Sequence, residues 1–291
     1  MAVTPHLFGS AGDVYPKILR DIVNEASGTA YSFMDIEEFK ALPPSLMNKV
    51  YWEEILYRVH WAAVANAIRH LRWFDACIVH TTLQPNYLAF CAALRGLLES
   101  AADTKHSLEA VPLTLASSAG GVLKALDGKL NNSIFISTEL ENCLIHFHHA
   151  RKVGKEEDAP PTHKAETAAK YVSAIDHAEY PVKELYSELC QVVHPAEPSL
   201  HWLSHVGEHG WEIGKQDDIG CIHKLVAQHK ETISWIQQNS GNITIFLCQV
   251  LNSLPREQLH IASVKPWNMS ELRLHNKIKT EFGRHGVQWP S

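Results

Sequence analysis

One segment of the chain constrains its fold more than any other, because it is almost entirely apolar yet carries a regular stripe of charge. Residues 87–104 read YLAFCAALRGLLESAADT, and the charged residues among them are Arg95, Glu99 and Asp103. The spacing i, i+4, i+8 places all three on one face of a helix. A helix that is apolar nearly all round is usually buried. We therefore expect Arg95 and Glu99 to be largely buried and bonded to groups on other helices.

The composition limits the classes of protein that this chain can belong to. Its 291 residues are 45% hydrophobic, which is enough for one large helical domain or two smaller ones. The net charge of −6 argues against an extensive nucleic-acid-binding surface, although a local basic patch stays open. The sequence identifies no partner.

The cysteines and the hydropathy of the sequence indicate in which cellular compartment the protein is located. The six cysteines are widely scattered and form no CxxC pair, so we expect reduced thiols without disulfides. No basic segment followed by an apolar stretch marks the first residues as a secretory signal, and no apolar run approaches about 18 residues. These features predict a cytoplasmic protein with no membrane association.

Apolar periodicity predicts a series of helices separated by proline- and glycine-containing breaks. The expected ranges are 15–26, 46–74, 87–104, 112–126, 138–152, 164–177, 181–194, 218–238 and 242–254, with a short helix after Ser270. In the second helix, Glu54 and Arg58 can pair at i, i+4. Residues 200–214 place apolar side chains on both sides of Gly207-Glu208-His209-Gly210, which predicts a short β-hairpin.

The predicted fold class is therefore mainly α, a multi-helix bundle with a small β-hairpin insertion near residues 200–214. We expect an N-terminal irregular or helical extension over residues 1–45, the bundle domain over 46–254 and a C-terminal extension over 255–291. The charged, proline-containing stretch 152–164 is a solvated loop, which is either a boundary or a connection between two antiparallel helices.

The charged stripe has two interpretations. Arg95 precedes Glu99 at i, i+4, which is the weaker orientation for local helix stabilisation, so another reason for the pair is needed. It is either a structural ion pair within the bundle or part of a polar pocket, because bundles build their sites from side chains on facing helices. Asp103 extends the same face as a binding candidate.

A second constellation lies in residues 186–195, YSELCQVVHP. Tyr186, Cys190 and His194 share one helical face, and His194 lies at the end of the expected helix. His194 either satisfies the last carbonyl groups of that helix or joins Arg95 and Glu99 in a polar cluster. The catalytic candidates are therefore Arg95, Glu99 and His194, and Tyr186 and Cys190 are binding candidates.

Metal and cofactor signals are weak. His146 and His149 lie at i, i+3, and Glu139 extends their face, so these three are the candidates for a zinc or iron site. The chain contains no HExxH motif, no phosphate-binding GxxxxGK[ST] loop, no GxGxxG and no GxSxG. We expect no metal and no cofactor.

Residues 93–104 (ALRGLLESAADT) and 186–199 (YSELCQVVHPAEPS) together resemble a pattern in bacterial helical-bundle proteins of unknown function. Those proteins have an Arg…Glu helix, then a Tyr-x-x-Leu-Cys…His-Pro helix and a short hairpin, and their bundle is loosely similar to HEPN domains of defence and toxin systems. The resemblance covers roughly residues 50–255 and implies Arg95, Glu99, Tyr186 and His194 as the matching positions. The Arg-x4-His nuclease motif of HEPN domains is absent here, which argues against ribonuclease activity.

These observations favour a non-catalytic cytoplasmic helical protein with a binding or assembly role, and the resemblance suggests bacterial defence. A homo-oligomer is compatible with that role. The alternative is a hydrolase or nuclease that uses Arg95, Glu99 and His194 as acid–base groups. A metal-binding helical protein is the third hypothesis.

Overall fold

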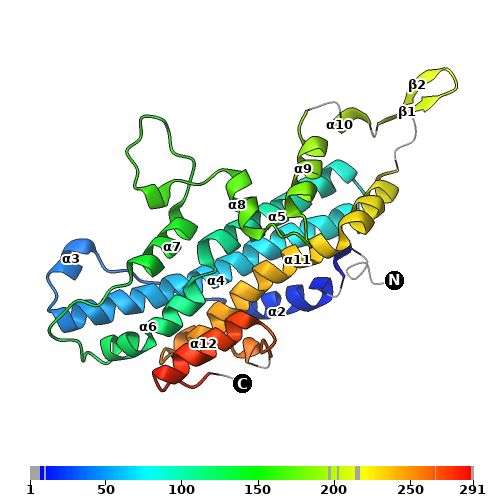
Figure 1. Ribbon diagram of the computed structural model, residues 1–291. Coiled ribbons are helices and arrows are strands. Elements are labelled where there is room, and N and C mark those ends of the chain that lie inside the picture. The colour runs from blue at the N-terminus through cyan, green and yellow to red at the C-terminus, as the bar shows by residue number, and fades with distance from the viewer. Residues whose placement is uncertain are drawn as a thin grey trace. The chain divides into compact units, whose positions relative to one another are not determined.

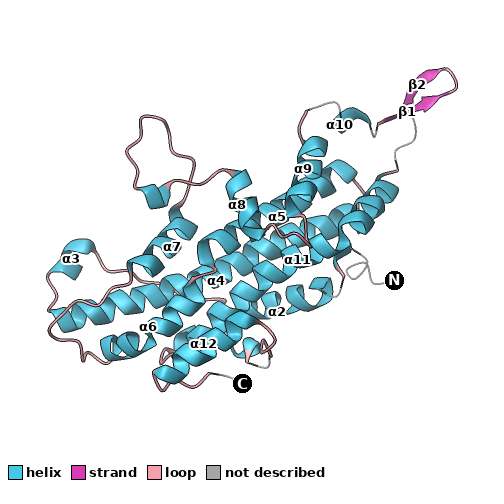
Figure 2. Ribbon diagram, in the orientation of Figure 1, coloured by secondary structure: helices cyan, strands magenta, loops and turns pink. Residues whose placement is uncertain are grey.

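The fold is mainly α with one small hairpin, as the sequence predicts (Figures 1 and 2). The computed structural model describes residues 7–9, 11–195, 198–201, 203–213, 217–265 and 267–289. The helices are α2 (Ala11–Glu25), α3 (Ile36–Lys40), α4 (Pro44–Thr82), α5 (Tyr87–Leu108), α6 (Val111–Leu126), α7 (Thr138–His149), α8 (Ala168–Ile175), α9 (Val182–Val193), α10 (Pro198–His201), α11 (Asp218–Asn252) and α12 (Arg273–Arg284). Short 3-10 turns are η1 (Pro161–His163), η2 (Glu257–Leu259) and η3 (Ala262–Val264).

The chain divides into two compact units. Unit 1 contains residues 1–19, 68–106 and 166–241, and unit 2 contains residues 20–67, 107–165 and 242–291. Helices α4 and α11 each contribute one part to unit 1 and the other part to unit 2. The division into a bundle and two terminal extensions stays a prediction. No helix within the described part of the chain is long and apolar enough to cross a membrane.

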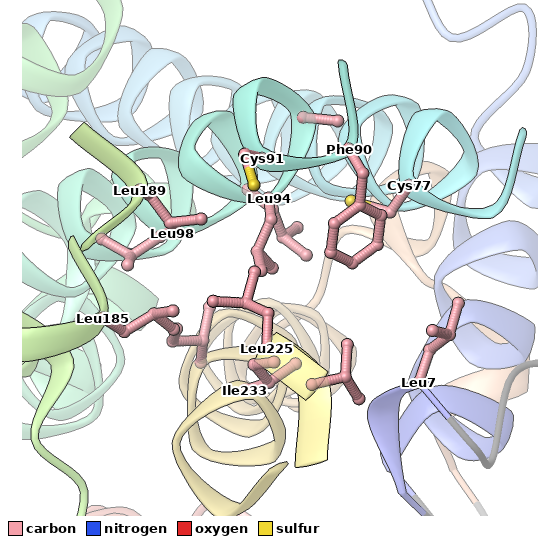
Figure 3. Packing of buried hydrophobic residues seen from close by; sticks show 14 of the residues in the cluster. Leu7, Cys77, Phe90, Cys91, Leu94, Leu98, Leu185, Leu189, Leu225 and Ile233 are labelled. Carbon is pink, nitrogen blue, oxygen red and sulfur yellow. The ribbon is translucent and has the colours of Figure 1, made fainter. Parts of the chain in front are cut away.

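Unit 1 is built around a core of leucines, isoleucines and small residues. Leu94 and Leu98 of α5, Leu185 and Leu189 of α9 and Leu225 of α11 are all buried and belong to one cluster (Figure 3). Their i, i+4 spacing gives each helix a continuous apolar stripe, which explains why α5 is buried on most of its surface. This core holds α5 and α9 next to each other.

Helix α4 is longer than the sequence predicts. It continues beyond Phe74 to Thr82, because Cys77 and Thr81 extend its buried stripe at helical spacing. The Thr81 hydroxyl also donates a hydrogen bond of 2.8 Å to the carbonyl oxygen of Cys77. The last turn of α4 stays helical, although it contains polar residues, because one side of it is buried.

Helix α11 corrects a second prediction. The sequence Asn239-Ser240-Gly241 was expected to separate two helices, but α11 runs through it and deviates from helical geometry at His229 instead (φ −116°, ψ 19°). A Cβ atom on Gly241 would lie 2.0 Å from the Tyr15 ring, so the glycine permits a close approach rather than ending the helix.

Unit 2 ties the segment 130–135 to the first half of α4. The Asn48 amide donates to the carbonyl oxygens of Leu130 (3.1 Å) and Ser133 (2.8 Å), and its oxygen accepts from the Phe135 N–H (2.7 Å). The Trp52 indole donates to the Phe135 carbonyl at 2.9 Å, and the two rings stack at 5.1 Å. These bonds position the start of α7, which Ser137 caps through the Leu140 N–H.

The hairpin pairs β1 (Ser204–Gly207) with β2 (Gly210–Ile213) in antiparallel register, with Val206 opposite Trp211. Gly210 has a φ of +118°, a conformation that side-chain-bearing residues rarely adopt. This confirms the hairpin prediction for residues 200–214; Trp202 lies outside the described residues. Val206, Trp211 and Ile213 are 72%, 67% and 89% exposed, so the hairpin has an apolar surface in contact with solvent.

Candidate functional site

Four of the predicted site residues meet in unit 1. Arg95 Nε donates to Glu99 Oε1 at 2.9 Å, and the Tyr186 hydroxyl donates to the same carboxylate oxygen at 3.0 Å. Arg95 Nη1 lies 3.3 Å from His194 Nε2, and the guanidinium carbon lies 5.5 Å from the centre of the Tyr186 ring. We call Arg95, Glu99, Tyr186 and His194 the Arg95 cluster. His194 thus lies next to Arg95 of α5, as the sequence predicts.

The cluster forms because the apolar faces of α5 and α9 pack against each other. Leu94 and Leu98 point into the core, which leaves Arg95 and Glu99 at the margin of the buried face. On α9, Leu185 and Leu189 are buried, so the adjacent Tyr186 lies at the same margin. Polar side chains at the edge of two packed apolar stripes are brought together by that packing.

The cluster is half-buried, which corrects the expectation that Arg95 and Glu99 are largely buried. Their side chains are 23% and 38% exposed, and His194 is exposed. Both residues nevertheless bond outside their own helix, as expected: Glu99 accepts from Tyr186 of α9, and Arg95 contacts His194, which directly follows α9. The cluster is therefore neither a sealed polar core nor an ordinary surface pair, and its groups are in contact with solvent.

The hydrogen bonds within the Arg95 cluster determine which donor and acceptor groups remain available to another molecule. A guanidinium only donates, so His194 Nε2 accepts from Arg95, which places the ring proton on Nδ1. Burial raises the pKa of Tyr186 to about 12, helped by its hydrogen bonds to Cys190 and Glu99. Although partial burial lowers the pKa of Arg95, the hydrogen bond and charge of Glu99 raise it overall. Tyr186 thus remains a phenol and Arg95 remains a cation near neutral pH.

The other two binding candidates, Asp103 and Cys190, differ in their relation to the Arg95 cluster. Asp103 Oδ2 accepts from Arg69 Nη1 of α4 at 2.6 Å, so its bond is with another arginine rather than with Arg95. Arg69 also reaches the Ser100 carbonyl and the Thr104 hydroxyl, both at 3.3 Å. Cys190 lies one turn from Tyr186 on α9, and its interaction with the hydroxyl helps to raise the pKa of Tyr186. The three charged residues of the stripe therefore do not form one network: Arg95 and Glu99 belong to the Arg95 cluster, and Asp103 pairs with Arg69.

The weak metal candidates do not converge. His146 Nδ1 lies 3.1 Å from the Thr162 carbonyl, His149 stacks on His163 at 5.5 Å, and Glu139 is exposed. Within the described residues, no three His, Cys, Asp or Glu side chains form a group that could hold a metal ion. The geometry thus offers no described ligand set for zinc or iron.

Sequence reasoning missed an acid–base pair that contains a buried histidine. His229 Nε2 lies 2.8 Å from Glu188 Oε2, and the histidine side chain is 7% exposed at the point where α11 departs from helical geometry. The two residues come from separate helices and fit no local motif, so the sequence contains no signal that joins them. The pair fastens α9 to α11 within unit 1.

Comparison with protein-family models, with curated protein sequences and with solved structures found no match for the chain. The functional argument therefore depends on the site's own geometry.

Proposed function

We propose that the protein acts through binding or assembly rather than catalysis, with the Arg95 cluster as its contact surface. The observation that carries this proposal is the bond between Arg95 Nη1 and His194 Nε2. It occupies the imidazole lone pair, so the ring offers an N–H donor and no base. Glu99 Oε1 is likewise occupied by two donors. Groups that satisfy one another and remain solvent-accessible suit recognition better than proton transfer.

A second copy of the chain fits this surface. The cluster offers donors on Arg95 and His194 and an acceptor oxygen on Glu99, and a surface with both is chemically able to pair with itself about a twofold axis. The exposed apolar side chains of the hairpin, Val206 and Ile213 among them, belong to the same unit and support an assembly role.

The six free cysteines support a reducing compartment, so we place the protein in the cytoplasm. A role in bacterial defence rests on the resemblance of residues 93–104 and 186–199 to the helical bundles named above.

Sedimentation analysis over a concentration series tests the proposal. The wild-type chain of 32.6 kDa is expected to shift towards a dimer as concentration rises. Arg95→Gln and His194→Ala are expected to weaken that association about tenfold, since each removes a donor worth about 1.4 kcal/mol. Arg69→Gln is the matched control, because it breaks a comparably exposed ion pair outside the cluster. A monomer at all concentrations would contradict self-assembly, and equal loss in the control would contradict the Arg95 cluster as its contact surface.

The alternative is a hydrolase or nuclease, and the proximity of Arg95 and His194 is the observation that favours it. Rotation of the His194 ring away from Arg95 would free its lone pair for general base catalysis, with Arg95 next to the developing negative charge. Single-stranded RNA and a phosphodiester chromogenic substrate are suitable probes. Turnover by the wild-type protein that both His194→Ala and Glu99→Gln abolish, while the circular dichroism spectrum is unchanged, would replace the binding proposal with this one.

A further inference from the structure

Unit 2 contains a hollow of about 230 Å³ that the Arg95 cluster does not involve. It lies between α4, α7 and η1. The two helices run in the same direction, since Tyr51 accepts from the Ser137 N–H at 3.2 Å near the start of α7 and the Arg58 carbonyl accepts from His148 at 3.1 Å near its end. Residues at equivalent heights on the two helices therefore face the same part of the hollow.

The charges of the hollow are separated by sign. On the two parallel helices, Glu54 and Glu141 follow the Tyr51–Ser137 contact by about one turn, which places both carboxylates at the end of the hollow next to Tyr51. Arg58 and His149 lie level with the Arg58–His148 contact at the other end, where His163 stacks on His149. The isoleucines of the lining, Ile55 and Ile145, come between the acidic and basic positions of their helices. Along α4, the acidic and basic positions Glu54 and Arg58 are about 6 Å apart on the helix axis. The hollow thus has an acidic end, an apolar middle and a basic end.

Two adjacent residues, Phe33 and Met34, keep the charges of Glu54 and Arg58 apart. Glu54 and Arg58 have the spacing of an ion pair, but Glu54 Oε1 accepts from the Met34 N–H at 2.6 Å. Arg58 lies over the Phe33 ring, with its guanidinium carbon 4.4 Å from the ring centre. Arg58 has no carboxylate partner within the described residues. Two opposite charges that would neutralise each other are therefore held apart and oriented in advance, which reduces the cost of binding.

The basic end is electropositive through Arg58. His149 stacks on His163 with a ring distance of 5.5 Å and an interplanar angle of 21°. Partial burial, His163 and the positive charge of Arg58 together lower the pKa of His149. His149 is consequently neutral near pH 7, where it serves as a hydrogen-bonding group beside the charged arginine.

We propose that this hollow binds a small zwitterion, a molecule in which an ammonium group and a carboxylate are joined by a short apolar chain. The ammonium group would contact Glu54 and Glu141, the carboxylate would contact Arg58, and the chain would lie along Ile55 and Ile145. A carboxylate oxygen that already accepts one hydrogen bond retains further lone pairs, so the acidic end can still accept from an ammonium group. The volume suits a small ligand, because sites for drug-sized molecules are about 300–1,000 Å³.

Isothermal titration calorimetry with a length series tests this proposal independently of the assembly proposed for unit 1. The probes are glycine, γ-aminobutyrate and ε-aminocaproate, with butyrate and butylamine as analogues that carry one charge each. The longer amino acids are expected to bind about tenfold more tightly than glycine or either singly charged analogue, because only they reach both ends of the hollow. Equal affinity for butyrate would reduce the site to a simple anion site and overturn the proposal.

Single-residue variants test which end of the hollow binds each charged group of the ligand. Arg58→Gln and Glu141→Gln are each expected to weaken binding of the best probe about tenfold, and Arg284→Gln, an exposed arginine elsewhere in unit 2, is the matched control. Phe33→Leu keeps every charge but removes the ring beneath Arg58, so it should also weaken binding even if a charge variant fails to fold. Absence of heat for every probe at millimolar concentration, or unchanged binding in all three hollow variants, would contradict the proposal.

Discussion

Arg95 in unit 1 and Arg58 in unit 2 each belong to an i, i+4 pair with a glutamate, but the two pairs run in opposite order along the helix and reach different environments. Glu99 follows Arg95, whereas Glu54 precedes Arg58, which is the more favourable order on a helix. Arg95 bonds to its glutamate, and that carboxylate is shared with Tyr186. Arg58 does not bond to its glutamate, because Phe33 and Met34 occupy the two side chains separately. An i, i+4 pair is worth only a few tenths of a kcal/mol on a helix surface, so tertiary neighbours decide whether it forms.

The largest expected effect concerns a feature that the two units share, a buried histidine on α4. Burial lowers the pKa of His60 in unit 2 and of His70 in unit 1 from 6.5 to about 4 in each case. His60 Nδ1 lies 2.6 Å from the Tyr31 hydroxyl, and His70 Nε2 lies 2.6 Å from Gln237 Oε1. Between pH 6.5 and 4 the unfolded chain binds protons that the folded chain excludes. Stability is therefore full above pH 6.5 and falls as pH decreases towards 4, by about 3 kcal/mol for each histidine.

Chemical denaturation at several pH values measures this loss. The His60→Gln and His70→Gln variants should each flatten the decline by about half, although each also changes a buried hydrogen bond. A stability profile of wild type that is flat from pH 7 to 4 would show that neither histidine excludes a proton.

A smaller effect tests whether the Arg95 cluster stabilises unit 1. Glu99→Ala leaves Arg95 and Tyr186 without their common acceptor, and the loss should be about 1–2 kcal/mol because the site is half-exposed. Thermal unfolding should show a decrease of roughly 2–8 °C. Glu99→Gln retains one oxygen acceptor and should lose less. A melting temperature equal to wild type in both variants would mark the cluster as a surface feature without structural effect.

The smallest effect is expected at Arg58, and it sharpens the contrast with Arg95. Arg58→Gln removes no ion pair and only the contact with the Phe33 ring, so the free energy of unfolding should change by less than about 1 kcal/mol. Urea denaturation of Arg58→Gln and Arg95→Gln side by side checks the ranking. If Arg58→Gln proves the more destabilising, the guanidinium supports the fold rather than a ligand.

The Arg95 cluster shows how far local patterns lead. The four residues of the Arg95 cluster lie on two helices, or in the case of His194 directly after one, whose apolar stripes are readable from the sequence. Packing of those stripes brings the polar margins together. The degree of burial was not readable, because it depends on how much of the margin the neighbouring helix covers. Asp103 illustrates this, since it shares the face of Arg95 but pairs with Arg69.

The sequence by itself determined the mainly α class, the hairpin near residues 204–213 and the two helices of the Arg95 cluster, because apolar periodicity and turn residues act over short distances. Tertiary structure decided the rest. The Tyr15 ring packs against Gly241 within α11, so this glycine serves a close contact and not a helix end. Glu54 and Arg58 stay apart because Met34 and Phe33 contact them. Each of these outcomes depends on residues far away in the chain, and the local preferences they override are worth about 1 kcal/mol or less.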